Sequence, residues 1–334
     1  MRKTKEISIE EIARLTGVST ATVSRVINNK DNVSAETKEK VLQMIEAKNY
    51  LLTSRQLKNQ LTDSNTIVVL LPDFSNPFNA MVIDGIRKVA NKNNYSLTFV
   101  LAKETGATFS YYETLLRDIH IAGIISLSAF PSLEIALEVQ KRWPLVMCSE
   151  YLDCSHISCV GIDDVTAAQQ ATSFLLKSGR KNIALINGSL DHKYARDREE
   201  GYNRALTLHD IDVREDLIVH LSTIHYQMAL SQLVFLFSQK TCIDSVFSCS
   251  DIFAAAAVEA AKKVGRKVPE DIAIVGFDNI DLSVMVSPSL TTVNQPSFEI
   301  GYQSCEILIE HIQKPHTEAK KVILFTDFII REST

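Results

Sequence analysis

The sequence predicts an α/β body of two doubly wound parallel-sheet subdomains, preceded by a small all-helical head. From about residue 66 onward, short apolar runs rich in β-branched residues alternate with segments of helical period, which is typical of parallel strands joined by helices. Residues 1–60 instead show three short helical patterns, and they carry eleven Lys or Arg against seven Asp or Glu, whereas the remaining residues carry 24 against 33. A basic head on an acidic body is expected when only the head contacts phosphate.

The head is predicted to contain three short helices. The first carries a capping-box pattern at Ser8 and Glu11 and ends at Gly17. Ser19 is the expected N-cap of the second helix, and the third begins at Ser34. Two helices joined by a turn of about three residues that contains Gly form a helix-turn-helix arrangement.

The second helix of the head has two different faces. Val23, Val26 and Ile27 are expected to face a small core. The other face carries short side chains, which allow a helix backbone to approach the base edges and phosphates of a DNA major groove. A small helical bundle whose hydroxyl groups only cap and solvate is the alternative interpretation.

The string ISIEEIARLTGVSTATVSRVINNKDNVSAETKEKVLQMIEAKNY, residues 7–50, resembles the DNA-binding head of the LacI/GalR family of bacterial transcriptional regulators. By this resemblance Thr20 and Ala21 occupy the two base-reading positions, a pair similar to that of the cytidine-repressor branch of the family. Further DNA contacts are implied at Ser19, Thr22, Ser24, Arg25 and Asn28.

A polar connector follows the head, and in relatives it forms a hinge helix that inserts a leucine into the minor groove. In this sequence Asn59 stands at the usual position of that wedge, and Leu52 replaces the usual proline. Leu57 or Leu61 is the substitute candidate for the wedge. A flexible tether without a wedge is the alternative.

Seven apolar runs in the body are expected to be strands, at 67–72, 96–102, 123–128, 144–148, 182–188, 245–250 and 272–277. Because about ten strands in all are too many for one doubly wound unit, two similar subdomains with a cleft between them are predicted. Ligands of such sheets bind beyond the carboxyl ends of the strands. The polar and aromatic residues at those ends are suited to a hydroxyl-rich ligand.

The body also resembles the LacI/GalR family, through strings such as LLPDFSNPF, YARDREEGYNRAL and VPEDIAIVGFDNIDL. Arg198 and Asp278 are expected to grip vicinal hydroxyl groups from opposite subdomains, and an ion pair between them is the alternative. Carried over by position, the effector pocket comprises Asn76, Phe78, Arg198, Ser250, Asp278 and Gln295, with His192, Tyr194 and Leu221 beside it and Ser128 as a further candidate.

The resemblance implies three domains: a helix-turn-helix domain over 1–50, a hinge over 51–65, and an effector-binding and dimerisation domain over 66–334. The last would divide into an N-subdomain of about 66–161 plus 295–320 and a C-subdomain of about 162–294 plus 321–334.

The predicted function is a DNA-binding transcriptional regulator, a repressor, that acts as a homodimer on double-stranded operator DNA. A small hydroxylated effector would control it, with a sugar as first choice and a nucleoside as second. Residues 76–90, with an apolar outer face, and residues 251–261 are the candidate dimer surfaces. A solute-binding protein or chemoreceptor-type sugar sensor without a DNA role is the alternative.

Other classes of function find no support in the sequence. There is no apolar secretory segment and no membrane-spanning run, so a cytoplasmic protein is expected. No GxSxG, phosphate-loop or HExxH motif occurs, so an enzyme is not expected. The six cysteines lack metal-ligand spacing, so no metal or cofactor is expected. Asp163 and Asp164 are interpreted as a helix cap rather than a catalytic carboxylate pair.

Overall fold

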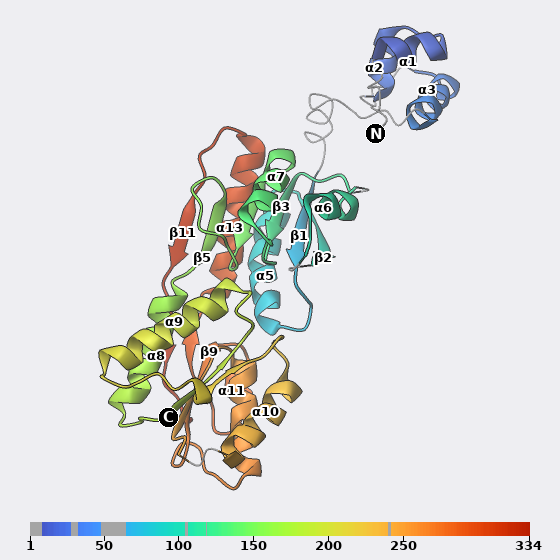
Figure 1. The fold of residues 1–334 in the computed structure, drawn as a ribbon. Helices are drawn as coiled ribbons and strands as arrows, with labels where there is room; N and C mark the ends of the chain where they lie inside the picture. The colour runs from blue at the N-terminus through green and yellow to red at the C-terminus, as the bar shows by residue number, and fades with distance from the viewer. Residues whose placement is uncertain (1–8, 28–32, 48–64, 104–105, 118, 240–241) are drawn as a thin grey trace. The chain divides into compact units, whose positions relative to one another are not determined.

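A computed structural model describes residues 9–27, 33–47, 65–103, 106–117, 119–239 and 242–334 (Figure 1). The backbone divides into two compact units. One comprises residues 1–66 with 118–122, and the other comprises residues 67–117 with 123–334. We call the three helices within residues 9–47 the head, and the sheets and helices from Thr66 onward the body.

The head consists of helices α1 (Ile9–Thr16), α2 (Thr20–Ile27) and α3 (Ala35–Ala47), so the three predicted helices are confirmed. Ser19 Oγ accepts a hydrogen bond from the backbone N–H of Thr22 at 3.1 Å, which confirms Ser19 as the N-cap of α2. The capping box predicted at Ser8 and the side chain of Ile27 lie outside the described residues. The head's core is small and is formed by Ile12, Ala13, Val23, Val26 and Val41.

Two six-stranded sheets form the body, which confirms the predicted α/β class. The first sheet contains β1 (Thr66–Leu71), β2 (Ser96–Leu101), β3 (Gly123–Ser126), β4 (Leu145–Cys148), β5 (Ser158–Ile162) and β11 (Lys321–Leu324). The second contains β6 (Ile183–Asn187), β7 (Ile218–His220), β8 (Ser245–Ser248), β9 (Ala273–Asp278), β10 (Thr291–Asn294) and β12 (Asp327–Ile329). The seven predicted strands are all among them.

The strand order is β11-β5-β4-β3-β1-β2 in the first sheet and β12-β10-β9-β8-β6-β7 in the second. Parallel pairing joins β11 through β1 in one sheet and β10 through β7 in the other, whereas β12 runs antiparallel to β10. The strands at the centre of both sheets are buried throughout, as parallel strands covered by helices on both faces must be. In parallel sheets of this kind, ligands bind beyond the carboxyl ends of the strands, so a ligand site is expected at that edge of each sheet.

Each sheet has its own set of helices, and together they form two lobes (Figure 1). The first lobe contains α5 (Pro77–Lys92), α6 (Phe109–Leu115), α7 (Leu133–Arg142) and α13 (Ser297–Gln313). The second lobe contains α8 (Asp164–Lys177), α9 (Lys193–Leu208), the 3-10 turn η1 (Glu215–Leu217), α10 (Tyr226–Gln239), α11 (Asp251–Lys263) and α12 (Leu282–Met285).

The chain passes between the two sheets three times: after β5, after β10 and between β11 and β12. The structure differs here from the predicted division, which placed residues 321–334 with the second half of the body. Lys321 to Leu324 pair with β5 of the first sheet, and the chain joins the second sheet only at Asp327. Two short strands separated by two residues can be assigned to different sheets only from their pairing partners.

Glycine permits a very close approach of two helices in each lobe. A Cβ on Gly85 of α5 would lie 2.0 Å from the carbonyl oxygen of Phe298, and one on Gly301 of α13 would lie 1.9 Å from that of Val82. In the second lobe, a Cβ on Gly201 of α9 would lie 2.3 Å from the carbonyl oxygen of Val165 in α8. No residue with a side chain fits at these positions without moving a helix.

The two candidate dimer helices differ from expectation. The outer face of α5, predicted to be apolar, is mixed: Ala80 is exposed, but so are Lys88 and the ion pair of Asp84 with Arg87 at 3.0 Å. The larger apolar side chains of α5, such as Phe78, Val82 and Ile86, pack into its own lobe. In α11, the alanines from 254 to 257 are buried in the second lobe.

Candidate functional site

The candidate DNA-reading surface is the exposed face of α2. Ser19, Thr20, Ala21 and Arg25 are exposed there, while Thr22 and Ser24 are half-buried. Val23 and Val26 point the other way, into the core of the head. The unpaired amides at a helix N-terminus attract phosphate, and short side chains leave room for a close approach. Of the predicted DNA contacts, Asn28 and Leu57 lie outside the described residues.

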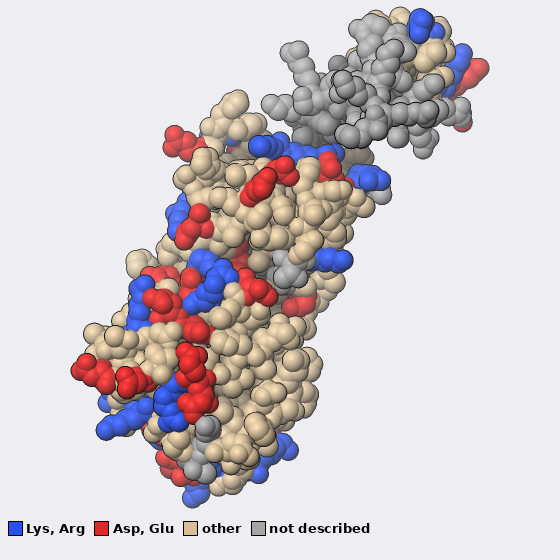
Figure 2. All heavy atoms as spheres, viewed as in Figure 1, with Lys and Arg blue, Asp and Glu red and all other residues tan. Residues whose placement is uncertain are grey.

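The surface of the body has no comparable basic character on the face that Figure 2 shows, where acidic and basic side chains lie intermixed. Surface ion pairs of the body, such as Arg204 with Glu200 and Lys320 with Glu310, bring charges of opposite sign together. Neighbouring charges of opposite sign cancel at a distance, so this face produces no strong field for a polyanion.

All the predicted effector residues lie at or beyond the carboxyl ends of strands, but they belong to different lobes. The first lobe contributes Asn76, Phe78 and Ser128, and the second contributes His192, Tyr194, Arg198, Leu221, Ser250 and Asp278; Gln295 follows β10 at a crossing between the lobes.

Arg198 of α9 is the centre of a buried ionic cluster in the second lobe. Its side chain, with the residue only 5% exposed, donates from Nε to Asp164 Oδ1 at 2.8 Å and from Nη1 to the carbonyl oxygen of Cys249. Nη1 also lies 3.7 Å from Asp278 Oδ1. The expectation that Arg198 and Asp278 act from opposite lobes is wrong, because α9 and β9 belong to the same lobe. The two side chains form an ion pair within the second lobe.

Two carboxyl groups near this cluster hold protons more tightly than usual. Burial raises the pKa of Asp278 to about 7 and that of Asp251 to about 8. Asp278 Oδ1 accepts a hydrogen bond from Gln295 Nε2 at 2.6 Å, and Asp251 Oδ1 accepts one from the Thr292 hydroxyl at 2.6 Å. The backbone of Asp278 has φ of 106°, a strained conformation for a residue with a side chain. Such strain is found most often at binding sites.

Aromatic rings flank the guanidinium group of Arg198. Its central carbon lies 3.6 Å from the centroid of the Phe277 ring and 5.1 Å from that of Tyr194. The Tyr194 ring stacks on that of His192 at 5.3 Å between centroids. Burial raises the pKa of the Tyr194 hydroxyl, which lies so close to Gly188 that a Cβ there would be 2.3 Å from it. The aromatic wall and the guanidinium are therefore held as one packed unit.

The candidates in the first lobe are neutral. Asn76 is the N-cap of α5, and its side chain accepts a hydrogen bond from the backbone N–H of Phe78 at 3.1 Å. The Phe78 ring is buried, and Ser128 is buried at the end of β3. The Ser126 hydroxyl donates to the Ser128 carbonyl at 2.8 Å, which fixes that turn.

Two further candidates have structural roles. Ser250 is the N-cap of α11 and accepts a hydrogen bond from the backbone N–H of Phe253 at 3.3 Å. Leu221 packs in the apolar core of the second lobe.

Asp163 caps α8, accepting a hydrogen bond from the backbone N–H of Thr166 at 3.0 Å, which confirms the cap predicted there. Asp164 pairs with Arg198 instead.

Sequence reasoning missed Glu150. This side chain follows β4 and its residue is 9% exposed, and it accepts hydrogen bonds from the backbone N–H groups of Lys193 and Tyr194 at 3.0 and 2.9 Å. Burial raises its pKa. Its partners are more than forty residues away in the chain, so no local pattern indicates the contact.

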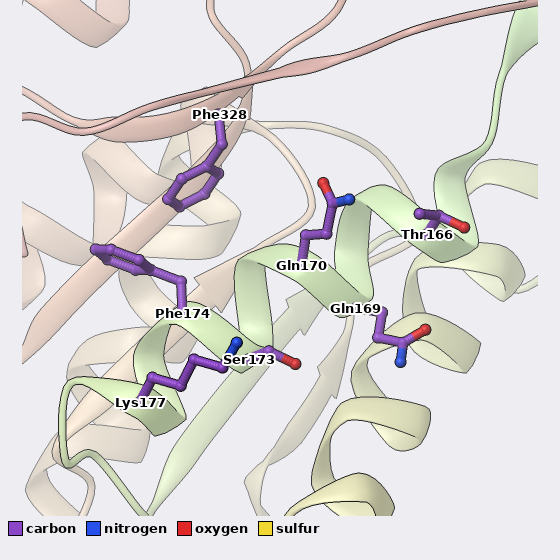
Figure 3. A pocket seen from close by; sticks show the side chains of 7 residues that line it. All are labelled: Thr166, Gln169, Gln170, Ser173, Phe174, Lys177 and Phe328. Atoms are coloured by element: carbon purple, nitrogen blue, oxygen red, sulfur yellow. The ribbon is translucent and has the colours of Figure 1, made fainter.

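A groove on α8 lies apart from these residues (Figure 3). Phe174 and Phe328 form one end of it, with their ring centroids 4.9 Å apart, and polar side chains of α8 line the remainder. The groove is lined by Thr166, Gln169, Gln170, Ser173, Phe174, Lys177 and Phe328. None of them is a predicted effector residue.

Within the described ranges, no group of three His, Cys, Asp or Glu side chains is placed to hold a metal ion. No helix among the described residues is both long and apolar enough to cross a membrane.

Comparison with known proteins gives two family matches. Residues 8–51 match the bacterial regulatory proteins of the lacI family, and residues 172–334 match the periplasmic binding protein-like domain. The ribose operon repressor of Halalkalibacterium halodurans is 33% identical over 327 residues, covering 98% of this chain and 97% of the relative.

Two further similarities extend over nearly the whole chain. The HTH-type transcriptional repressor CytR of Escherichia coli is 32% identical over 98% of this chain and 96% of its own length. Among solved structures, the complex of the transcriptional regulator CelR with cellobiose has a TM-score of 0.75 at 28% identity, covering 98% of this chain and 100% of the other.

Proposed function

This chain belongs to the LacI family of bacterial regulatory proteins, and we propose that it is a transcriptional repressor whose operator affinity is set by a small hydroxylated ligand bound between its two lobes. The observation that carries the proposal is the presence, in one chain, of a helix-turn-helix DNA-binding head and a two-lobed binding-protein body. A solute-binding protein without a DNA role would not need the head.

In the proposed DNA complex, α2 enters the major groove. Thr20 and Ala21 read base edges, and Arg25 contacts phosphate, because these side chains are exposed on the face opposite the core. We assign the head to residues 1–50, the hinge to 51–65 and the effector and dimerisation domain to 66–334. Selection of bound sequences from a random DNA pool tests the assignment: the full chain should enrich a specific site, and a chain without residues 1–60 should enrich none.

The functional unit is proposed to be a homodimer. One short recognition helix covers only half of an operator, so two heads related by a twofold axis would read a near-palindrome. The selected sites should therefore show twofold symmetry, and sedimentation of the purified protein should give twice the chain mass. Asymmetric single sites bound by a monomer would contradict this part of the proposal.

The effector is proposed to be a sugar. One relative is named for the ribose operon, and a similar structure holds cellobiose. A nucleoside is the second choice, because the Thr20 and Ala21 pair resembles that of the cytidine-repressor branch. Arg198 and Asp278 of the second lobe offer a donor and an acceptor for hydroxyl groups, and the Phe78 ring of the first lobe offers an apolar face.

A thermal-shift assay with ribose, cellobiose and cytidine tests the effector class. A ligand at 100 times its dissociation constant adds about 2.7 kcal/mol of stability, which is readily measured. Stabilisation by a sugar alone supports the first choice, and stabilisation by cytidine alone supports the second. No shift with any of the three, in a protein that still selects DNA, would contradict both.

We further propose that the protein binds its ligand without chemical change and acts in the cytoplasm. The relatives are transcriptional repressors, and the buried acids Asp164, Asp251 and Asp278 are each engaged with neighbouring side chains. A repressor acts on the chromosome, so it must reside where the chromosome is. Recovery of unaltered ligand after long incubation checks the first statement, and cell fractionation checks the second.

A further inference from the structure

The first turn of α9 is capped by a residue of the other lobe. His192, its N-cap residue, makes no side-chain capping hydrogen bond. Instead, Glu150 Oε2 accepts from the Lys193 N–H at 3.0 Å, and Glu150 Oε1 accepts from the Tyr194 N–H at 2.9 Å. Five other helices of the body are capped by their own N-cap residues, Asn76, Thr108, Ser132, Asp163 and Ser250, whereas α12 and α13 have no side-chain cap.

Glu150 is anchored firmly in the first lobe. The N–H of Ser149 donates to the Val160 carbonyl of β5 at 2.8 Å, and the N–H of Glu150 donates to the Cys148 carbonyl of β4 at 2.9 Å. Ser149 has φ of 68°, in the left-handed region, so the chain turns sharply just before Glu150. Helix α9 belongs to the second lobe, where Gly201 packs against α8. The two hydrogen bonds therefore join the lobes.

A second contact between the lobes adjoins the first. The Lys193 ammonium lies 4.3 Å from the centroid of the Tyr151 ring, and it also pairs with Asp197 one turn along α9. Tyr151 is held in the first lobe by Gly161, since a Cβ there would lie 2.7 Å from the ring. Two consecutive residues of the first lobe thus hold two consecutive residues of the second.

This contact is stable only while the lobes are together. A buried carboxylate is tolerated when charge-assisted hydrogen bonds satisfy it, and the N-terminus of a helix provides both donors and a favourable dipole. Separation of the lobes would remove both hydrogen bonds at once and leave the first turn of α9 without a cap. That turn precedes Arg198 and contains Tyr194, which line the candidate effector site.

We propose that Glu150 is a positioning residue that holds the first turn of α9 from the opposite lobe. It sets the positions of the His192 and Tyr194 rings, and it favours the arrangement in which the two lobes are in contact. The inference rests on contacts within the body and does not depend on the class of effector.

The experiment compares Glu150→Ala and Glu150→Gln with a matched control in the full chain. Asp244 Oδ2 also accepts hydrogen bonds from two consecutive backbone N–H groups, those of Lys181 and Asn182, at 2.8 and 3.1 Å, but entirely within the second lobe. Asp244→Ala therefore removes a similar pair of bonds without a contact between lobes.

Two readouts are needed. Hydrogen exchange measures protection of the Lys193 and Tyr194 amides. Spin labels on Lys141→Cys of α7 and Lys177→Cys of α8, both exposed sites, measure the distance between the lobes by double electron–electron resonance. Cys154 and Cys242 are first replaced by Ser in every variant, and labelled protein is diluted with unlabelled protein so that only distances within one chain are seen.

The expected result is that Glu150→Ala speeds exchange of the two amides by about tenfold or more and shifts the label distances to longer, broader values. Asp244→Ala should leave the distances unchanged. Glu150→Gln keeps one acceptor oxygen and should give an intermediate shift, and it serves as the test if the alanine variant does not fold. Faster exchange with unchanged distances would show that Glu150 is a helix cap only and would overturn the proposal, as would no change in either readout.

Discussion

The two lobes share one architecture but place different chemistry at the ends of their strands. Each has a six-stranded, mainly parallel sheet with helices on both faces. The first lobe presents the neutral residues Asn76, Phe78 and Ser128, whereas the second holds Arg198 within reach of Asp164 and Asp278. The fold fixes where a ligand can bind, and the side chains at that edge decide what each lobe contributes.

The difference concerns electrostatics more than packing. Both lobes use glycine to bring two helices into close contact, at Gly85 and Gly301 in the first and at Gly201 in the second. The second lobe alone combines that tight packing with a buried cation among the residues that we assign to the effector site. A buried cation is stable only when anionic groups neighbour it, so the contribution of Arg198 to stability depends on Asp164 and Asp278.

The largest loss of stability is expected when the Arg198 cation is removed. We expect Arg198→Ala to lower the free energy of unfolding by about 3–5 kcal/mol, because Asp164 would be left buried without its partner. Urea denaturation followed by circular dichroism measures the loss. Arg204→Ala, on the same helix but exposed and paired only with Glu200, is the control and should lose less than about 1 kcal/mol. Equal, small losses would mean that the second lobe does not depend on its buried charge.

The helix contacts provide the next test, and here the two lobes should behave alike. Gly301→Ala and Gly201→Ala each place a methyl group against a backbone carbonyl, so each should lower the free energy of unfolding by about 1–3 kcal/mol. The same denaturation measurement applies. A loss confined to one variant would show that the resemblance between the lobes does not extend to the packing of their helices.

The pH dependence of stability should reveal the raised pKa of a buried acid in the second lobe. The pKa of Asp251 is raised from 3.8 to about 8 by burial, so between these values the folded protein holds this proton more tightly than the unfolded chain does. Its contribution is fully present below the unfolded pKa and is lost as pH rises towards the folded pKa, by at most about 1.4 kcal/mol per pH unit.

Asp251→Asn should therefore flatten the decline in stability between about pH 5 and about pH 8, because the variant has no proton to lose at this position. Denaturation curves at several pH values, with wild type and variant compared at each, isolate the contribution of Asp251 from that of other groups. Parallel curves for the two proteins would contradict the raised pKa.

The smallest loss of stability is expected from a substitution in the first lobe. Ser126→Ala removes the hydrogen bond to the Ser128 carbonyl, a neutral pair, and should lower the free energy of unfolding by about 1 kcal/mol. The measurement is the same urea titration. A loss as large as that of Arg198→Ala would remove the distinction between the neutral candidates of the first lobe and the ionic candidates of the second.

Much of the fold and part of the site could be predicted from the sequence because they depend on local patterns. Helix caps such as Ser19 and Asp163 act within three residues of their own position, and the seven apolar runs are strands. The rule that ligands bind at the carboxyl ends of strands selects candidate effector residues that lie at or just beyond those ends in the folded chain.

The errors concern contacts between distant parts of the chain. Arg198 and Asp278 were assigned to opposite lobes, and Lys321 to Leu324 were assigned to the wrong sheet, because neither a helix period nor a strand pattern names its partner. The sequence predicts an apolar outer face on α5, whereas the exposed residues there are mixed, with Asp84, Arg87 and Lys88 beside Ala80.

The sequence by itself determined the family, the alternation of strands and helices, and the first turns of the helices that cap themselves. Only the tertiary structure decided which charges meet, which strand joins which sheet, and that Glu150 of one lobe caps α9 of the other. The physical reason is range: propensity, periodicity and capping act over a few residues, whereas buried ion pairs and contacts between lobes exist only after the folded backbone has brought remote residues together.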